Sequence, residues 1–303
     1  MLSRHITHYN LVKILRCLNC SASLRAETNH LVCEKCKQKF PIKRNIPVML
    51  NSNSQIASEK FVQTFYNQFP YNIDANENYS KENLPVGQLP DYLFKNVDRS
   101  QTIIDVGCGV GRYLRLLRYL DCSPIGVDQS LQTLFEVKSE MKGVELLNAS
   151  NLNLPIKDDV GDWIISAGVI HHTGDTRKAF SELVRICKPS GRIYLMVYQK
   201  WSNYYLIYTT VGSLLRLIYF SIPLGKIFSR QVLMPLFNIV DNLVNRKGRT
   251  LNKSISLYAD YFLQPIATFH TNEQLASWCK EEGVKCKLYP KNHPTMVSLI
   301  LTK

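Results

Sequence analysis

Short apolar runs alternate with stretches of helical periodicity through the middle of the chain. The first run, 102–106 (TIIDV), leads through a short turn into 112–117, where leucines recur at helical spacing. Similar runs at 124–128 and 162–167 are followed by segments that suit helices. Because strands that alternate with helices build a parallel sheet, the pattern predicts an α/β fold.

The C-terminal part of the pattern predicts how this sheet ends. The expected elements are a helix over 175–187, a terminating Lys188–Gly191 turn, a strand over 192–198, a helix over 271–282 capped by Thr271, and an antiparallel strand pair at 285–289 and 296–301. Together with the earlier runs they complete a seven-stranded, doubly wound (Rossmann-like) sheet with helices on both faces.

An insertion of about seventy residues separates the strand ending at Tyr198 from the helix beginning at Thr271. Its segment Tyr204–Leu224 is 21 residues long, and Arg216 is its one charge. We expect an α-helical cap at 200–258, because so long a connection is usually functional. Three interpretations stay open: buried cap helices, a membrane-surface or lipophilic-substrate face, or a membrane span. A span is disfavoured because Arg216 would lie near the bilayer centre.

Four cysteines near the N-terminus form two Cys-x-x-Cys pairs, with twelve residues between the pairs: Cys17, Cys20, Cys33 and Cys36. This spacing predicts a structural zinc site with a closed tetrahedral shell. The alternative is a set of reduced or redox-active cysteines, for which one pair would suffice. Residues 11–50 also resemble the small zinc-ribbon family that activates tRNA and protein methyltransferases as a separate subunit. The resemblance implies a methyltransferase next to the ribbon.

Residues 51–60 are polar and aperiodic, which marks a boundary. A short amphipathic helix is expected over Phe61–Phe69, since apolar residues recur at helical spacing before Pro70. It is either a helix packed on the next domain or a lid over a bound ligand, in which case Tyr66 is a candidate substrate contact. The predicted domains are a zinc ribbon (1–52), a linker with the lid helix (53–100) and a catalytic domain with the cap insertion (101–303).

Composition and charge add limits on the environment and the partners. The chain is 45% hydrophobic and 20% charged, which excludes a disordered or fibrous protein. Its formal charge of +13 favours contact with phosphates, nucleic acid or an anionic membrane. Nine cysteines are an odd number, and Arg4, His5 and His8 interrupt any leader-like apolar run. We therefore expect a cytoplasmic chain, open to peripheral contact with a membrane, and not a disulfide-bonded secreted protein.

A glycine-rich turn follows the first strand directly. Gly107, Gly109 and Gly111 alternate with other residues, so the backbone turns sharply and a ligand can approach it. The second strand ends about twenty residues later in Asp128, where a ribose diol would donate two hydrogen bonds. A dinucleotide is the alternative ligand, but its motif is Gly-x-Gly-x-x-Gly. The turn spacing, with Asp105 two residues upstream, disfavours it.

Residues 102–198 resemble a class I S-adenosylmethionine-dependent methyltransferase. The motifs that carry the resemblance are, in order, Asp-Val-Gly-Cys-Gly-Val-Gly, Gly-Val-Asp, Leu-Pro, Val-Ile-His-His-Thr and Lys-Pro-Ser-Gly-Arg. The residues it implies for S-adenosylmethionine are Asp105, Gly107, Gly109 and Gly111 for the methionine part, Asp128 for the ribose and Gln129 beside the adenine. Many members have an Asp five residues before the Pro of Leu-Pro, and this Asp accepts a hydrogen bond from the adenine amino group. This chain has Ser150 there, followed by Asn151, and either side-chain oxygen can accept that bond.

His171 and His172 are the candidate catalytic residues. They follow a strand at its carboxyl end, where open α/β sheets bind ligands. An imidazole suits proton removal near neutral pH, although in similar enzymes a His-His-Thr run here often shapes the cofactor pocket instead. Because methyl transfer is an in-line displacement at an activated carbon, a base is needed only if the acceptor must lose a proton.

The insertion and the segment after it concern the acceptor. Tyr261 and His270 lie in the stretch 258–271, which returns to the pocket mouth in similar enzymes, so both are candidate acceptor contacts. Between Trp201 and Tyr258 seven basic residues stand against one acid, Asp241. Basic charge among aromatic side chains suits nucleic acid or an anionic membrane interface.

We expect methyl transfer to a small or lipophilic metabolite, because the large apolar cap can enclose one. RNA (rRNA or tRNA) base methylation is the alternative, supported by the +13 charge and by zinc ribbons fused to ribosomal RNA methyltransferases. A third hypothesis is a catalytically inactive binding module, against which the intact glycine turn and Asp128 speak. No obligate protein partner is implied.

Overall fold

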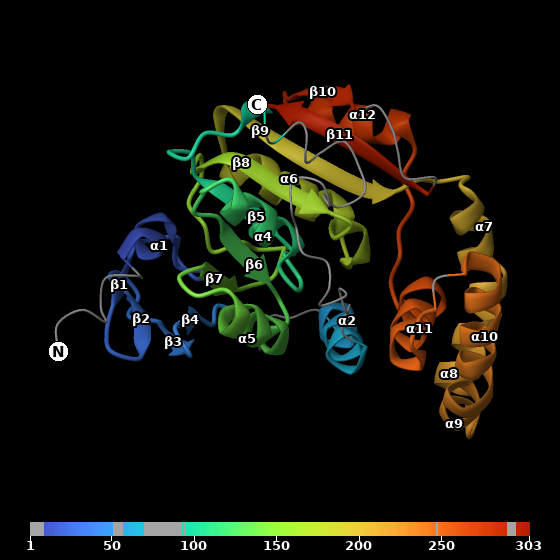
Figure 1. The fold of residues 1–303 in the computed structure, drawn as a ribbon. Coiled ribbons are helices and arrows are strands. Elements are labelled where there is room, and N and C mark those ends of the chain that lie inside the picture. The colour runs from blue at the N-terminus through green and yellow to red at the C-terminus, as the bar shows by residue number, and fades with distance from the viewer. Residues whose placement is uncertain (1–8, 51–56, 70–92, 94, 247, 290–294) are drawn as a thin grey trace.

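The computed structural model describes residues 9–50, 57–69, 93, 95–246, 248–289 and 295–303 (Figure 1). Most of the predicted linker, 70–92, lies outside the described residues. The core is a seven-stranded sheet in the order β10-β11-β9-β8-β5-β6-β7. Its strands are β5 (Ile103–Val106), β6 (Ile125–Asp128), β7 (Glu145–Asn148), β8 (Gly161–Ala167), β9 (Cys187–Tyr198), β10 (Lys285–Leu288) and β11 (Met296–Thr302). Five strands are parallel and β11 pairs antiparallel with both β9 and β10, so the predicted doubly wound sheet is confirmed.

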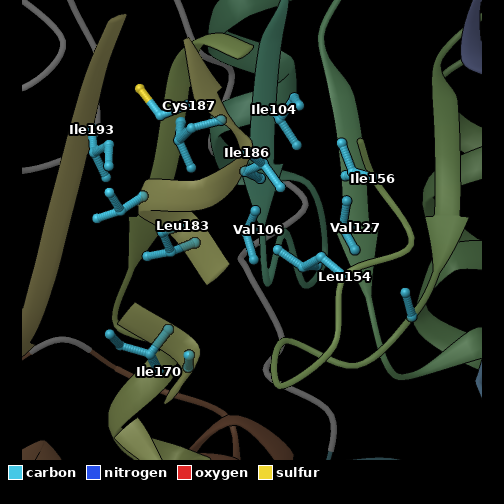
Figure 2. Close-up of a cluster of buried hydrophobic side chains, with 14 of the residues drawn as sticks. Ile104, Val106, Val127, Leu154, Ile156, Ile170, Leu183, Ile186, Cys187 and Ile193 are labelled. Atoms are coloured by element: carbon cyan, nitrogen blue, oxygen red, sulfur yellow. The ribbon is translucent and has the colours of Figure 1, made fainter. Parts of the chain in front are cut away.

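Helices cover both faces of this sheet because its central strands are apolar on both sides. Along β5, Ile103 packs towards α4, whereas Ile104 and Val106 join the opposite core beside α6 (Figure 2). Leu183 and Ile186 of α6 meet them there, fully shielded from solvent. The flanking helices are α2 (Ala57–Gln68), α4 (Arg112–Tyr119), α5 (Leu131–Glu140), α6 (Thr176–Ile186) and α12 (Asn272–Glu281).

Strand β9 begins at residue 187, five residues earlier than predicted from the sequence. Its register with β8 shifts between Gly161 and Trp163, so residues 188–191 form a bulge in the strand. Ser190 takes a left-handed backbone conformation (φ 65°), and its N–H donates to the carbonyl of Lys303 at 2.8 Å. The predicted turn is therefore present, but as a bulge within the strand.

The N-terminal region folds as a small antiparallel sheet with one short helix. Its elements are α1 (Tyr9–Ile14), β1 (Leu24–Ala26), β2 (His30–Cys33), β3 (Lys39–Lys43) and β4 (Ile46–Pro47). We call residues 9–50 the ribbon. Leu15 forms an antiparallel bridge with Ile156, and Val48 forms a parallel bridge with Asn148 at the end of β7. The ribbon is therefore fixed to the β7 side of the core sheet.

The four ribbon cysteines converge on one point. Cys17 Sγ lies 3.6 Å from Cys36 Sγ, Cys20 Sγ lies 3.4 Å from Cys33 Sγ, and all four sulfurs are within 4.8 Å of one another. A tetrahedral zinc–thiolate site with bonds of about 2.3 Å spaces its sulfurs by about 3.8 Å. Backbone N–H groups of Asn19 and Cys36 point at Cys17 Sγ and Cys33 Sγ, both at 3.4 Å. The cluster thus fits a structural Zn²⁺ with a complete thiolate shell.

The long insertion forms a helical cap, as predicted. Its helices are α7 (Asn203–Thr209), α8 (Val211–Ser221), α9 (Gly225–Phe228), α10 (Met234–Asn245) and α11 (Leu251–Tyr258), with π-helical turns at Ser229–Leu233 and Ala259–Leu263. They stack beside the sheet on the flank away from the ribbon (Figure 1). Their core of Tyr219, Met234 and Tyr258 also receives Phe65 of α2 and Phe69, the residue that follows the helix. The apolar run Tyr204–Leu224 is divided at Thr210, and no described helix is both long and apolar enough to cross a membrane.

Replacing Cys17 with serine tests the metal assignment. We expect the zinc content of purified protein to fall from one ion per chain towards zero, and the melting temperature to fall by roughly 5 °C or more, because metal binding and ribbon folding are coupled. Atomic emission and thermal unfolding measure the two effects. Cys286→Ser, an exposed cysteine outside the cluster, is the matched control. Wild-type protein that purifies without zinc from zinc-containing medium contradicts the assignment.

Candidate functional site

The turn after β5 leaves its backbone open to a ligand. The N–H groups of Gly107 and Cys108 both donate to the carbonyl of Val127, at 2.8 and 3.0 Å, which ties the turn to β6. A Cβ on Gly107 would lie 2.2 Å from a methyl group of Val169, so only glycine fits there. At Gly109 (φ 49°) a Cβ would meet nothing within 4 Å. That empty space above a positive-φ glycine is a cradle a cofactor can fill.

The carboxylate of Asp128 fixes the two loops that flank this cradle. One oxygen accepts from Gly109 N at 2.9 Å and the other from Ser130 N at 2.8 Å. Burial raises the pKa of Asp128, while these N–H groups lower it. Since each carboxylate oxygen can accept more than one hydrogen bond, both stay open to a ribose diol. Asp128 therefore has a structural role that the sequence analysis did not foresee, beside its predicted one.

Asp105, two residues before Gly107, is a buried acid. Its side chain is 2% exposed, and Oδ2 has no hydrogen-bond partner in the described part of the chain. Burial, and next the Asp128 carboxylate, raise the pKa of Asp105 to about 8. An unpaired buried carboxyl is costly, so this position calls for a cationic ligand group. The ammonium group of a bound amino-acid moiety fits that requirement.

The predicted adenine contacts lie beyond the end of β6. The carbonyl of Gln129 accepts from Asn148 Nδ2 at 3.0 Å and from Gln63 Nε2 of α2 at 2.8 Å. Asn151 Oδ1 is buried with no partner among the described residues, whereas Ser150 Oγ accepts from Leu152 N at 3.1 Å. Of the two candidates at this position, Asn151 thus offers the vacant acceptor that an adenine amino group needs. The residues of the site fit S-adenosylmethionine, although their individual roles remain predictions.

Helix α2 joins the cofactor loop to the cap. Besides the Gln63 bond, Asn67 Oδ1 accepts from Ser130 Oγ at 3.0 Å. On its other side Tyr66 is partly buried, and its hydroxyl accepts from Gln264 Nε2 of the cap at 2.7 Å. The Tyr66 ring centroid lies 6.2 Å from that of His172. Tyr66 is therefore close to the candidate catalytic pair.

The two histidines lie in a 3-10 turn (Ile170–His172) after β8, and their environments differ. His172 Nδ1 is 2.8 Å from the carbonyl of Ile266, so Nδ1 carries the proton and Nε2 keeps its lone pair. Burial lowers the pKa of His172 to about 4. His171 is fully buried, neither ring nitrogen has a partner among the described residues, and its ring lies 3.9 Å from that of Tyr198. Burial lowers the pKa of His171 well below its usual range.

The sequence analysis missed a carboxylate near this pair. Asp260 Oδ1 accepts from Gln264 Nε2 at 2.7 Å, the same nitrogen that donates to Tyr66. Burial raises the pKa of Asp260 to about 6. Tyr198 and Tyr204, whose rings are 4.8 Å apart, complete an aromatic wall between His172 and the cap. The only local signal was one acid in an otherwise apolar and aromatic stretch. We call Tyr66, His172, Tyr198, Tyr204 and Asp260 the aromatic cluster.

The other two residues predicted to contact the acceptor, Tyr261 and His270, are less well placed to do so than Tyr66. Tyr261 is 42% exposed, and its ring lies 5.7 Å from that of Tyr204 in the aromatic cluster. His270 uses both ring nitrogens inside the protein, with Gln274 Oε1 at 3.1 Å and Thr268 Oγ1 at 3.2 Å. His270 therefore has no free nitrogen for an acceptor in this structure. Contact between either residue and an acceptor stays a prediction.

Comparisons with known proteins agree with this geometry. A family model described as "Methyltransferase domain" matches residues 104–195. The tRNA (carboxymethyluridine(34)-5-O)-methyltransferase of Arabidopsis thaliana is 30% identical over 159 residues, which are 51% of this chain and 38% of that protein. The probable tRNA methyltransferase 9B of Mus musculus is 36% identical over 32% of this chain and 21% of that protein. The chain thus spans well under two thirds of the length of these relatives.

A solved structure supports the same fold. PKMT2 from Rickettsia typhi in complex with AdoHcy superimposes with a TM-score of 0.50 at 17% identity, over 71% of this chain and 52% of that one. At this identity the similarity concerns the fold alone. The glycine cradle, the sheet order and the family model matched over residues 104–195 together identify a class I S-adenosylmethionine-dependent methyltransferase domain, preceded by a four-cysteine ribbon.

Proposed function

We propose that the chain transfers the methyl group of S-adenosylmethionine to a nucleophilic acceptor. The observation that carries the proposal is the buried, unpaired carboxyl of Asp105 beside the open cradle at Gly109. A binding module that never held the cofactor would gain nothing from that costly arrangement. When bound, the cofactor supplies a methyl carbon activated by its positive sulfur. The protein then has to orient the acceptor and exclude water.

RNA is the acceptor class that the relatives support. Two of those described above are named as tRNA methyltransferases, and the formal charge of +13 favours a polyanion. This evidence favours the alternative hypothesis over the small or lipophilic metabolite that the sequence analysis preferred. The family model covers residues 104–195, which hold the cofactor elements and not the cap. The choice of RNA as acceptor therefore rests on the names of the relatives and on the net charge of the chain.

A lipophilic acceptor is the second candidate, and a specific observation favours it. The aromatic cluster brings the rings of Tyr66, Tyr198 and Tyr204 together beside the apolar cap. Aromatic side chains also stack on nucleobases, so the cluster alone does not separate the two classes. The apolar outer surface of the cap, in contrast, suits no polyanion.

We assign proton removal, where the acceptor needs it, to Nε2 of His172. The bond from Nδ1 to Ile266 fixes the ring and its tautomer, as a base requires. The lowered pKa keeps the imidazole neutral at physiological pH. In this assignment His171 only packs beside His172. Asp260 is a positioning residue, because it holds Gln264, which in turn donates to the Tyr66 hydroxyl.

Labelled cofactor tests the acceptor class directly. Purified protein is incubated with methyl-labelled S-adenosylmethionine and either total RNA or an organic-solvent extract of cells. We expect label in the RNA fraction, removed by ribonuclease. Label in the organic extract alone selects the lipophilic acceptor, and calorimetry that detects no cofactor binding contradicts methyl transfer altogether.

Asp105→Asn tests the predicted cationic partner. We expect S-adenosylmethionine affinity to fall about tenfold or more, because a hydrogen bond to a charged group contributes about 1.5–3 kcal/mol. The raised pKa means that the ligand-free folded state binds a proton between about pH 4 and 8 that the unfolded state has lost. Ligand-free stability should therefore fall as pH rises through this window, and the variant should lack that component. Thermal unfolding at pH 5.5 and 8.5 measures it. Asp121→Asn, an exposed carboxylate, is the control.

The pH dependence of methyl transfer tests the assignment of the base. With His172 Nε2 as the proton acceptor, kcat at saturating cofactor and substrate should stay level from pH 8 down to about 5 and fall only as the imidazole protonates near 4. His172→Asn should lower kcat by about 10²–10⁴. If the rate instead falls near pH 6, and this fall is absent from Asp260→Asn, then Asp260 and not His172 accepts the proton.

A further inference from the structure

The outer surface of the cap concentrates exposed apolar side chains. Of the 22 large hydrophobic residues exposed in the described part of the chain, 18 lie between Trp201 and Leu251. Leu224, Val244 and Leu243 are 75%, 73% and 72% exposed. We call the exposed apolar side chains of residues 206–244 the cap ridge. Soluble monomers scatter such residues singly, so their concentration on one small group of helices indicates an interaction surface.

Helix α10 shows that hydrogen bonds inside the cap determine which side chains the ridge exposes. Its exposed apolar residues fall at the i, i+3, i+4, i+7, i+8 positions of one face: Leu236, Ile239, Val240, Leu243 and Val244. The polar residues face the cap interior instead. Asp241 accepts from Arg249 Nη1 at 2.6 and 2.7 Å, and Asn238 Nδ2 donates to Ser254 Oγ at 2.7 Å. These bonds hold the helix with its polar face inward and its apolar face outward, the reverse of a helix that meets water.

The charges on this surface are positive. Lys226, Arg230 and Arg246 are exposed, and none forms an ion pair among the described residues. Asp241, the one acid of the segment 201–250, is buried against Arg249. A second copy of the chain would bring like charges together, and RNA offers nothing to an apolar ridge. An anionic bilayer complements both the charge and the apolar surface.

We propose that the cap ridge docks on membranes that contain anionic lipid, with α8 and α10 lying in the plane of the interface. This inference goes beyond the proposed methyl transfer and does not rest on it. At 11 and 12 residues the two helices are about 17 Å long, which suits insertion along the interface. Lys226, Arg230 and Arg246 then contact headgroup phosphates.

Docking would bring the aromatic cluster close to the lipid. In α7, Tyr204 and Tyr208 are buried with Tyr198, while Leu206 and Ile207 on the same helix are 53% and 43% exposed. Only the width of one helix, about 10 Å, separates the two faces. The candidate site would therefore lie close to the membrane surface.

Vesicle flotation tests the inference with the full chain. We expect wild-type protein to float with phosphatidylcholine vesicles that contain roughly 30% phosphatidylglycerol, and much less with phosphatidylcholine alone. The triple variant Leu236→Ser, Leu243→Ser, Val244→Ser should lower partitioning about tenfold or more. Lys226→Glu with Arg230→Glu should do the same at low salt. Lys142→Glu with Lys287→Glu makes the same charge change outside the cap and should leave flotation unchanged.

Each variant is first shown to bind S-adenosylmethionine with unchanged affinity, which separates lost docking from lost folding or a failed cofactor assignment. Absence of flotation with either vesicle overturns the proposal. So does a wild-type dimer that the triple variant converts to monomer without any vesicle binding, since the ridge then contacts a second copy. Equal flotation of wild type and triple variant also overturns it, because binding then lies elsewhere.

Discussion

Hydrogen bonds to residues 128–130, at the end of β6, tie the ribbon and helix α2 to the core sheet. The partly buried carboxylate of Asp128 holds the glycine turn and the start of α5 through the N–H groups of Gly109 and Ser130. On the other side, Asn148 donates to the backbone carbonyls of residues 128 and 129, while its own backbone carbonyl accepts from the N–H of Met49 in the ribbon. The carbonyl of residue 129 also accepts from α2. Hydrogen bonds to a charged group are stronger than those between neutral groups. This short segment therefore couples three parts of the chain that are distant in sequence.

Features set by neighbouring residues were predictable from the sequence. The strand runs, the glycine turn and the acid that ends β6 depend on local period and spacing, and the structure places Asp105 and Asp128 together at the carboxyl edge of the sheet. The cysteine cluster was predictable for the same reason, since two pairs at hairpin spacing have few other ways to fold. The cap at Thr271 followed too, since its side chain accepts from Gln274 N.

Features set by tertiary hydrogen bonds were not predictable. Residues 188–191 turn as their composition indicates, but they do so as a bulge within β9 that is bonded to Lys303. The apolar period of α10 predicts a buried face, but Arg249 draws the polar side inward and leaves that stripe outside. Asp260 gained its place beside the aromatic cluster only through Gln264 and Tyr66, the latter almost two hundred residues away in sequence. In each case a tertiary hydrogen bond modifies the local pattern.

The attachment of the ribbon has a consequence for how the molecule avoids self-association. An open sheet has two edge strands whose free N–H and C=O groups can pair with another chain. At one edge, β10 is short, fully exposed and carries Lys285 and Lys287, which repel a second strand. At the other, Val48 and Met49 of the ribbon occupy Asn148 at the end of β7. If the ribbon unfolded, this second edge would be exposed to pairing with another chain. The four cysteines, which hold the ribbon together around a metal, therefore also reduce aggregation.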